Sequence, residues 1–468
     1  MRRRDFLKGV GAVTLGMTAK ISRAGTERSR RPNILFIMTD QQFAEIMSCR
    51  MGKRYINTPA MDSLAQSGMM FTRAYTANPL CMPARGSIFS GRFPHETEVQ
   101  SNTHRKLDLQ ELPAMGTYFK NAGYDTGYVG KWHLCYNQRK VDEHGFGMTA
   151  VLRNNGHDDE MPNPAVEFVK KKREKSFLLV VSFSNPHDIC QWARFQKLPS
   201  GEVGEPPAVE ERPPLRDNHE PPENETDAMA LMRKSYHNTT TFPVGDYTEE
   251  QWRRHIWGYY RLVEKVDALI GRVLDALRES GQREDTLVVF TSDHGDCHGA
   301  HKFNQKTVFY DESARVPFIM SYSGKIKKGA TDMLVNTGID IMPTLFDYAG
   351  IRQPERMPGR SLRNIAESRE PASWRRYVVV QNYMIQGGPV NGEKPRVQGR
   401  MVRSEQYKYC VYDRGERREA LFDMQRDPGE MKNIAYDPSC ADVLELHRGY
   451  LREHAVRYKD EVALAMLD

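Results

Sequence analysis

The sequence lacks a hydrophobic run long enough to cross a membrane. A transmembrane helix needs about 20 apolar residues, and the apolar run at residues 9–19 falls well short of that. The sequence also lacks basic tracts and interleaved basic and aromatic residues, which are typical of nucleic-acid-binding proteins. We therefore expect a soluble protein with no stable membrane anchor and no nucleic-acid partner.

A dense cysteine framework is also missing. The seven cysteines are an odd number, lie far apart and include no C-x-x-C pair, so neither a zinc site nor a small disulfide-rich domain is indicated. Single disulfides stay possible. The sequence contains no internal repeat and no low-complexity tract. Its 468 residues, 39% hydrophobic and 27% charged, are typical of a globular protein with one large domain and a smaller one.

The N-terminus resembles a twin-arginine export signal. Consecutive arginines at 2–4 precede the short apolar run, and a small-residue cleavage site follows at 22–24. We therefore expect cleavage after about Ala24 and export to the periplasm or the cell exterior. Residues 1–24 carry six basic side chains against Asp5, which accounts for +5 of the formal net charge of +6. The nearly neutral remainder still allows a small basic pocket for an acidic substrate.

Four apolar segments predict buried β-strands, at 33–39, 126–130, 177–184 and 286–292. Helical patterns lie between them. The segment 58–68 has Thr58 as an N-cap and Pro59 at the first helical position, and 259–279 carries one apolar stripe. Strands that are apolar throughout and alternate with helices predict an α/β fold, in which helices cover both faces of a large, mostly parallel sheet.

The composition changes twice along the chain. The segment 201–227 is rich in Pro, Glu and Arg, which indicates a long surface excursion between core elements. After about residue 372, short strand-like pieces at 376–383 and 407–413 precede a closing helix, a pattern that predicts a smaller α+β subdomain. We therefore expect an export signal at 1–24, a catalytic domain at 25–372 with a surface insertion at 201–257, and a C-terminal subdomain at 373–468.

The segment 78–91, NPLCMPARGSIFSG, places a thiol at a predicted helix start. Pro83 suits the first helical position and Gly91 the position after the last turn, so Cys81 would lie at the positive end of this helix, beside Arg85. Such an end stabilises negative charge, and Cys81 would therefore meet an anion. The local pattern leaves the alternative open that Cys81 is a small buried hydrophobic residue, the commonest fate of a free cysteine.

Polar residues follow every predicted core strand. They are Asp40 and Gln41 after the first, Lys131 and His133 after the second, His187 after the third, and Asp293 and His294 after the fourth. A solvated loop would explain any one of them. Because ligands bind outside the carboxyl ends of strands in open parallel sheets, the whole set predicts a single crevice.

Some of these side chains suit a divalent cation. The carboxylates of Asp40 and Asp293 and the carbonyl oxygen of Gln41 favour Ca²⁺, whereas the nitrogen of His294 leaves room for Mn²⁺. The same segment contains three further polar residues to which the pattern assigns no role, namely Asp296, His298 and His301.

The ordered motifs resemble those of the type I sulfatases, formylglycine-dependent members of the alkaline phosphatase superfamily. The motifs span nearly all of the chain after residue 24: PNILFIMTDQQ, CMPAR as C-x-P-x-R, GYDTGYVGKWH, SNPH, SDHG and YKY…LFDMQRDPGE. The resemblance implies an alkaline phosphatase-like fold and a sulfuric ester hydrolase that releases inorganic sulfate, with sulfated carbohydrates as its substrates. It also implies that a formylglycine-generating enzyme converts Cys81 to 3-oxoalanine (formylglycine), whose hydrate is the nucleophile.

The resemblance further implies a role for each residue of the crevice. The metal ligands would be Asp40, Gln41, Asp293, His294 and an oxygen of modified Cys81. Arg85 would orient the hydrate, Lys131 and Lys306 would hold sulfate oxygens, His187 would protonate the leaving alcohol and His133 would remove a proton from the second hydroxyl. Two positions depart from the usual pattern, because Gln41 stands where many members have a second Asp and Ala84 where Ser is frequent.

Two other functions stay open. A phosphodiester or phosphonate monoester hydrolase of the same superfamily would share C-x-P-x-R and the Asp-His metal pair. A non-catalytic glycan-binding relative is less consistent with a complete set of catalytic residues, because buried charges are costly. The particular sulfate ester is not indicated; the candidate substrate-binding residues are Arg153, Asn154, His157, Gln191 and those of the insertion at 201–257.

Overall fold

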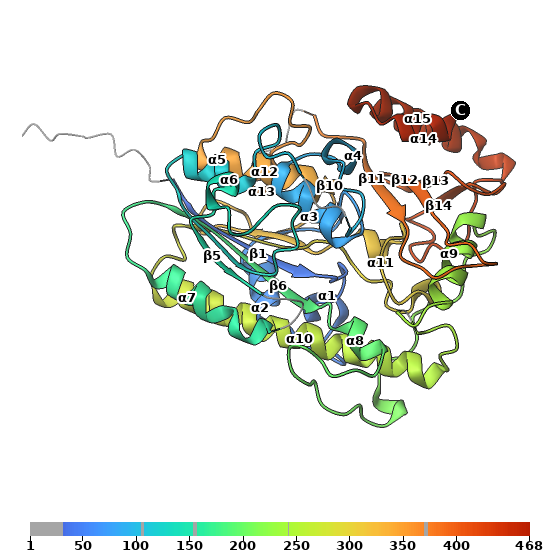
Figure 1. Ribbon diagram of the computed structural model, residues 1–468, viewed down its shortest axis with the longest axis horizontal. Helices are drawn as coiled ribbons and strands as arrows, with labels where there is room; N and C mark the ends of the chain where they lie inside the picture. The colour runs from blue at the N-terminus through green and yellow to red at the C-terminus, as the bar shows by residue number, and fades with distance from the viewer. Residues whose placement is uncertain (1–30, 104–106, 153–156, 242, 369–372) are drawn as a thin grey trace, which may run out of the picture. The chain divides into compact units, whose positions relative to one another are not determined.

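The computed structural model describes residues 31–103, 107–152, 157–241, 243–368 and 373–468 (Figure 1). The expected export signal and two candidate substrate-binding residues, Arg153 and Asn154, lie outside the described residues. Within the described residues, no helix is long and apolar enough to cross a membrane. Export and the division at residue 372 therefore stay predictions.

The main sheet has eight strands and confirms the predicted α/β class. Strands β5, β4, β6, β1 and β7 run parallel, whereas β8 is antiparallel to β7. The four predicted strands are β1, β4, β6 and β7. In the order of the sheet the strands are β5 (Met148–Val151), β4 (Asp125–Gly130), β6 (Phe177–Pro186), β1 (Asn33–Asp40), β7 (Thr286–Ser292), β8 (Phe318–Ser321), β2 (Met69–Phe71) and β9 (Gly329–Thr331).

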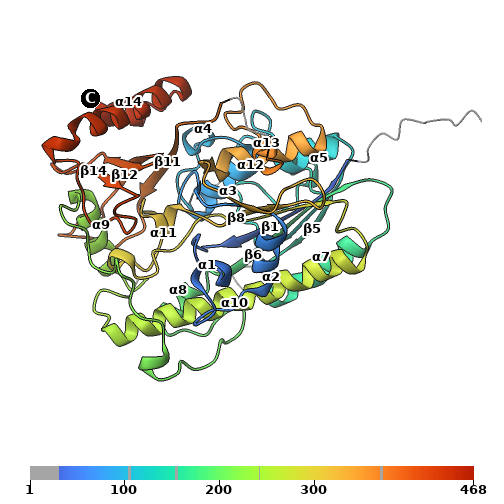
Figure 2. The same ribbon diagram turned by 180° about the vertical axis from the view of Figure 1, so that it is seen from behind.

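Helices cover both faces of this sheet (Figures 1 and 2). Because side chains alternate along a strand, Leu35 and Ile37 of β1 face one core, and Ile34 and Phe36 face the other. The first core is closed by α2 (Pro59–Ser67), α7 (Pro162–Lys170), α8 (Ile189–Ala193) and α10 (Glu249–Glu279). The second is closed by α3 (Cys81–Ser90), α5 (Met115–Asn121), α12 (Thr337–Ala349) and α13 (Arg363–Ala366).

Helix α10 differs from the expectation at its N-terminus. It begins at Glu249, ten residues before the predicted start, because Thr248 and Gln251 form a capping box. Trp252 and Ile256 are buried, so the boundary that we expected at residue 257 lies within a core helix. The segment 201–257 also contains α9 (Asp227–His237) and the 3-10 turn η2 (Val209–Glu211).

A second sheet forms the C-terminal part. It is antiparallel, and its helices are α14 (Ala441–Tyr458) and α15 (Glu461–Leu467). Strand β12 was not predicted, because its polar and Gly-containing sequence VQGRMVRS lacks the apolar run of the others. The strands, in order, are β11 (Tyr377–Met384), β12 (Val397–Ser404), β13 (Tyr407–Tyr412) and β14 (Glu419–Asp423).

Strand β11 connects this second sheet to the segment that precedes α3. The backbone N–H of Gln381 donates to the carbonyl oxygen of Ala77 at 2.9 Å. Asn336 Nδ2 donates to the backbone carbonyl oxygen of Val379, also at 2.9 Å. The short remaining elements are α1 (Ser48–Met51), α4 (Pro94–Thr97), α6 (Val141–His144), α11 (Asp311–Ala314), β3 (Ala74–Tyr75), β10 (Val335–Asn336), η1 (Asp158–Glu160), η3 (Ala300–Lys302) and η4 (Pro438–Cys440).

Candidate active site

The candidate site lies where the carboxyl ends of β1, β4, β6 and β7 meet the N-terminus of α3. Helix α3 begins at Cys81, two residues earlier than Pro83 predicts, and Gly91 ends it in the left-handed conformation with φ 69°. Cys81 and Arg85 are four residues apart in α3 and therefore lie on one face of the helix. The thiol lies at the helix start, as the sequence predicts, and it is buried.

The Arg85 side chain links α3 to the four central strands through hydrogen bonds to residues in these strands or directly after them. Its Nε donates to Asp293 Oδ2 at 2.8 Å, and its Nη2 donates to Asp40 Oδ2 at 3.0 Å. Its Nη1 donates to the Lys131 carbonyl oxygen at 3.0 Å and to Ser182 Oγ at 2.9 Å. The guanidinium is fully buried. Burial lowers the pKa of Arg85, but Asp293 and Asp40 outweigh this effect and raise it, so the side chain stays charged.

Four buried side chains near Arg85 converge on one point. Ligand atoms of Asp40, Cys81, Asp293 and His294 all lie within 4.8 Å of one another. His294 Nε2 lies 3.1 Å from Cys81 Sγ and 3.5 Å from Asp293 Oδ1. The other ring nitrogen, Nδ1, lies 2.8 Å from its partner, the Gly295 carbonyl oxygen. If Nδ1 donates this bond, Nε2 is left as the atom that faces the cluster, which is the form that binds metals.

The charges of this cluster fit a bound cation. Burial would raise the pKa of Asp40, but Lys131 and other nearby cations hold it well below its usual value. Burial, and then the charge of Asp40, raise the pKa of Asp293 to about 6. Two buried carboxylates in contact with one imidazole disfavour each other's ionised form, and a divalent cation between them removes that cost.

Gln41 is held at the edge of the cluster. Its backbone is left-handed, with φ 71°, and its N–H donates to Asp293 Oδ1 at 3.2 Å. Its Oε1 accepts from Lys306 Nζ at 2.6 Å, while its Nε2 donates to Asp296 Oδ2 at 2.5 Å. Tyr259 OH donates to the Gln41 carbonyl oxygen at 2.7 Å. Asp296 and Tyr259 therefore orient Gln41. For Asp296 the only sequence signal was its place three residues after Asp293.

Two buried lysines flank the cluster. Lys131 Nζ lies 2.8 Å from Asp40 Oδ2, and Lys306 Nζ lies 3.3 Å from Cys81 Sγ. Their exposed fractions are 4% and 3%. Burial and Asp40 would raise the pKa of Cys81, but the surrounding cations, chiefly Lys306, outweigh both and hold it well below its usual value. The position of Sγ therefore favours negative charge, as the helix-end argument predicts.

The two predicted histidines lie near this cluster, His187 in the folded structure and His133 in the sequence. Burial, and then Lys131 and Lys306, lower the pKa of His187 to about 3, so its imidazole is neutral and carries one N–H. His133 follows Lys131 by two residues in a left-handed conformation, with φ 43°. Among the described residues, the Nδ1 atoms of both histidines are buried and have no hydrogen-bond partner.

A cavity of about 530 Å³ leads to the cluster. His187 and Lys306 line it, and so does Gln191, one of the predicted substrate-binding residues. His157 is exposed and does not line this cavity; it precedes η1, where Asp158 accepts hydrogen bonds from backbone N–H groups of β6. Several other residues that line the cavity were not predicted, and they include Asn102, Arg194 and Lys394.

Two of those residues add positive charge to the cavity. Arg194 lies just after α8 and its Nε donates to the Cys190 carbonyl oxygen at 2.7 Å. Lys394 is exposed and lies between β11 and β12, so the C-terminal part contributes to the same cavity. Neither lies near a recognisable motif, and only the tertiary fold brings them beside Lys306.

Comparisons with known proteins show which proteins this chain is similar to. The sulfatase family model matches residues 32–351, and the model of the C-terminal part of N-sulphoglucosamine sulphohydrolase matches residues 299–456. The Δ4,5-hexuronate-2-O-sulfatase of Bacteroides thetaiotaomicron is 29% identical over 465 residues, which are 95% of this chain and 93% of that protein. The uncharacterized sulfatase YidJ of Escherichia coli is 31% identical, over 92% and 88%. The solved structure of a 2-O GAG sulfatase is 28% identical, covers 92% of this chain and 94% of its own, and has a TM-score of 0.80.

Removing the Arg85 guanidinium tests its place in this cluster. We expect Arg85→Ala to lower the free energy of unfolding by about 3–5 kcal/mol, because it leaves Asp40 and Asp293 buried without their shared partner. Arg85→Lys keeps the charge but loses the planar guanidinium, so the decrease in the free energy of unfolding should be smaller. The measurement is the urea unfolding midpoint.

Arg352→Ala is the matched control, because the Arg352 side chain is 91% exposed. It should change stability by no more than about 0.5 kcal/mol. If Arg85→Ala unfolds at the same urea concentration as this control, Arg85 does not hold the strand ends together.

Proposed function

Because the chain belongs to the sulfatase family, we propose that it releases inorganic sulfate from an acidic sulfated sugar and uses residue 81, converted to formylglycine, as its nucleophile. One observation carries this proposal: Cys81 Sγ lies at the start of α3, 3.3 Å from Lys306 Nζ and beside buried carboxylates. Such a position suits a nucleophile that must approach a charged sulfur centre.

The contacting atom in the structure is the sulfur of unmodified Cys81, which stands in for the oxygens of the formylglycine hydrate. A maturation enzyme would have to oxidise Cβ to the aldehyde. When formed, the hydrate at this position supplies a hydroxyl nucleophile. Arg85 lies one helical turn away and fixes the carboxylates of Asp40 and Asp293 against this position.

Lys131 and Lys306 would bind the sulfate oxygens. Both ammonium groups are buried next to the nucleophile, Lys306 at the inner end of the cavity. Charge that develops on the equatorial oxygens during attack at sulfur would meet two fixed cations in a water-poor site, where such interactions are strongest. Binding one sulfate ester, a monoanion, would also offset the positive charge of Lys131 and Lys306 that the pairing of Lys131 with Asp40 does not already offset.

His187 and His133 would move the protons. His187 lines the cavity through which the sugar enters, so we assign to it the donation of a proton to the leaving alcohol oxygen. Its ring is neutral in the free protein, because burial, and then the charges of Lys131 and Lys306, lower its pKa. It must therefore take up this proton when the sulfate anion binds and offsets those charges. We assign to His133 the removal of a proton from the second hydroxyl at position 81, which frees the sulfate. Their unpartnered Nδ1 atoms leave both rings free to bind substrate or water.

One divalent cation would be held by Asp40, Asp293, His294 and the oxygen at position 81, with the Gln41 amide oxygen close by. When bound, it would neutralise charge on the sulfate and on the nucleophile. We propose Ca²⁺, because most of these ligand atoms are oxygens, with Mn²⁺ as the alternative.

Basic side chains in the cavity lining support an acidic sugar as the substrate. Arg194 and Lys394 line the same cavity as Lys306 but lie outside the cluster that would hold the sulfate. They would bind a second anionic group of the substrate, such as a uronate carboxylate. The Bacteroides relative that acts on a sulfated hexuronate is consistent with this substrate class.

Sulfate release tests the reaction. We expect the mature protein to release inorganic sulfate from a 2-O-sulfated unsaturated hexuronate disaccharide and to leave the sugar skeleton intact, as measured by ion chromatography. Lys394→Met should raise KM about threefold to tenfold, or about 0.7–1.4 kcal/mol, because a rim charge is lost. Lys328→Met is the control, since Lys328 is exposed and does not line the cavity.

Different outcomes of this assay contradict different parts of the proposal. Turnover of phosphate diesters alone, with no sulfate released from any ester, would favour the phosphohydrolase alternative. Sulfate release from neutral sugars at the same efficiency as from uronates would retain the sulfatase and remove the acidic substrate.

Chelation tests the metal. Protein treated with EDTA and dialysed should lose activity, and Ca²⁺ should restore it. At about 100 times its Kd, Ca²⁺ should also add about 2.7 kcal/mol of stability, seen as a higher melting temperature. Asp293→Asn should abolish this shift, whereas Asp142→Asn, whose side chain is fully exposed, should keep it. Full activity in metal-free protein with no thermal response would exclude the site.

The leaving group tests His187. We expect His187→Gln to lower kcat for a sugar sulfate by about 10²–10⁴, because an alkoxide leaves poorly without a proton donor. The same variant should lose much less with p-nitrophenyl sulfate, whose phenolate leaves unaided. Equal losses on both substrates would show that His187 is not the proton donor.

A further inference from the structure

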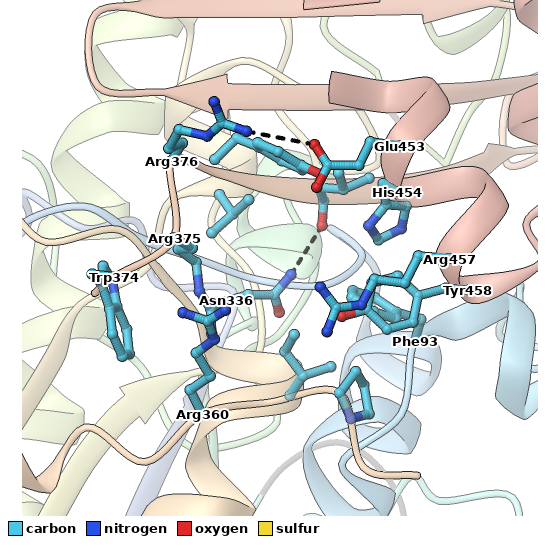
Figure 3. A pocket seen from close by; sticks show the side chains of 15 residues that line it. Phe93, Asn336, Arg360, Trp374, Arg375, Arg376, Glu453, His454, Arg457 and Tyr458 are labelled. Carbon is cyan, nitrogen blue, oxygen red and sulfur yellow. Dashed lines mark hydrogen bonds and ion pairs between the residues drawn. The ribbon is translucent and has the colours of Figure 1, made fainter. Parts of the chain in front are cut away.

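A second cavity, of about 180 Å³, lies away from the candidate site (Figure 3). One water molecule needs about 10–15 Å³, so this cavity is many times larger than a single-water site. Its walls come from Phe93 beyond α3, Asn336 at the N-cap of α12, the segment 374–376 before β11, and α14. Cys81 and Phe93 lie at opposite ends of α3, which is roughly 15 Å long, so one small ligand cannot occupy both sites.

Positive charge dominates this cavity. Four arginines line it, and Glu453 is the one acidic side chain among the lining residues. Figure 3 shows Arg360 and Arg375 on one side and Arg457 on the other, with Asn336 between them. Arg375 pairs with Asp340 at 2.6 Å, and the fourth arginine, Arg376, lies 3.8 Å from Glu453.

The guanidinium groups of the remaining two arginines contribute no polar contact to the described fold. Within the described residues, the guanidinium groups of Arg360 and Arg457 make no ion pair and no hydrogen bond to the protein; Arg457 only lies over the Tyr458 ring, 5.3 Å from its centroid. His454 also lines the cavity, is 97% buried and has an Nε2 atom without a partner among those residues. A buried polar atom without a partner is costly unless a ligand or water completes it.

An adjoining cavity adds a surface for a sugar. It has a volume of about 580 Å³ and shares Trp374, Arg375 and Arg376 with the first cavity. Tyr407 and Tyr450 also line it. Arg376 lies over the Tyr450 ring, 5.3 Å from its centroid. Three arginines and two acidic residues, Asp332 and Glu405, line this cavity, so its lining carries one net positive charge. Aromatic side chains beside these polar groups suit a sugar ring.

We propose that the arginine cavity binds an oxyanion group, a sulfate ester or a uronate carboxylate, of an acidic glycan chain. Arg360 and Arg457 supply its charge and His454 a neutral hydrogen-bonding nitrogen. The adjoining cavity receives the neighbouring sugar. The glycan identity rests on the proposed function, but the binding of the oxyanion does not. The protein therefore holds an acidic chain at a place separate from the residues that cleave it.

Direct binding measurements test this inference without the need for turnover. The probes are heparin for sulfate esters, polygalacturonate for carboxylates and dextran as a neutral chain, each titrated against the full protein by calorimetry. We expect Arg360→Ala/Arg457→Ala to weaken binding of heparin, polygalacturonate or both at least tenfold. A loss for one acidic probe alone assigns the anion, and dextran should not bind at this cavity.

Arg352→Ala/Arg426→Ala is the matched control, because it removes the same charge from side chains that are 91% and 88% exposed and line neither cavity. Both double variants should keep the wild-type melting temperature and the wild-type turnover of a monosulfated sugar. Equal losses in the two double variants would show only diffuse electrostatic attraction and overturn the proposal, as would unchanged binding in Arg360→Ala/Arg457→Ala. If no sulfate ester is cleaved but the selective loss remains, the binding site stands and the proposed reaction fails.

Discussion

The buried guanidinium of Arg85 is the contact on which the site depends. Its nitrogens donate to two carboxylates, one backbone carbonyl and one hydroxyl, and these acceptors lie on four different strands or directly after them. A planar fork with five donors satisfies this arrangement, whereas a lysine ammonium cannot reach all of the acceptors at once. The same residue lies one turn after Cys81, so its contacts with the sheet also fix the position of residue 81.

The free-energy cost of burying these charges accounts for the other charged residues of the site. Asp40 and Asp293 are fully buried and in contact with the same guanidinium, and burial of such charges is expensive unless each is paired. Lys131 adds a second cation to Asp40, while Lys306 is shared between Gln41 and Cys81. An anion beside the lysines and a divalent cation beside the carboxylates would each compensate charges that the fold has already buried.

Much of this could be predicted from the sequence. The four central strands are apolar throughout, and a polar residue that follows such a strand has few structural reasons to be there. Their carboxyl ends therefore predicted Asp40, Lys131, His187 and Asp293 in one place, and the structure brings them together. Pro83 and Gly91 bracket a short segment and predicted that Cys81 lies near a helix start, but its functional role came only from the resemblance of CMPAR to C-x-P-x-R.

The rest depends on tertiary contacts that leave no local pattern. Asp296 orients Gln41 only because a turn brings it back to 2.5 Å. Lys394 lies in the connection between β11 and β12, more than 300 residues from Cys81 in sequence, and only the folded chain places it in the lining of the same cavity as Lys306. The early start of α10 was missed because its first turns pack polar and aromatic residues together, which weakens the apolar stripe.

The central claim is that residue 81 acts as formylglycine and not as a thiol. The most direct measurement compares preparations made with increasing amounts of a formylglycine-generating enzyme. Peptide mass spectrometry gives the converted fraction at residue 81, and sulfate release gives the turnover of each preparation. The account predicts that turnover rises in proportion to the converted fraction and extrapolates to zero for unconverted protein. A preparation that carries only cysteine at residue 81 and turns over at the full rate would contradict it.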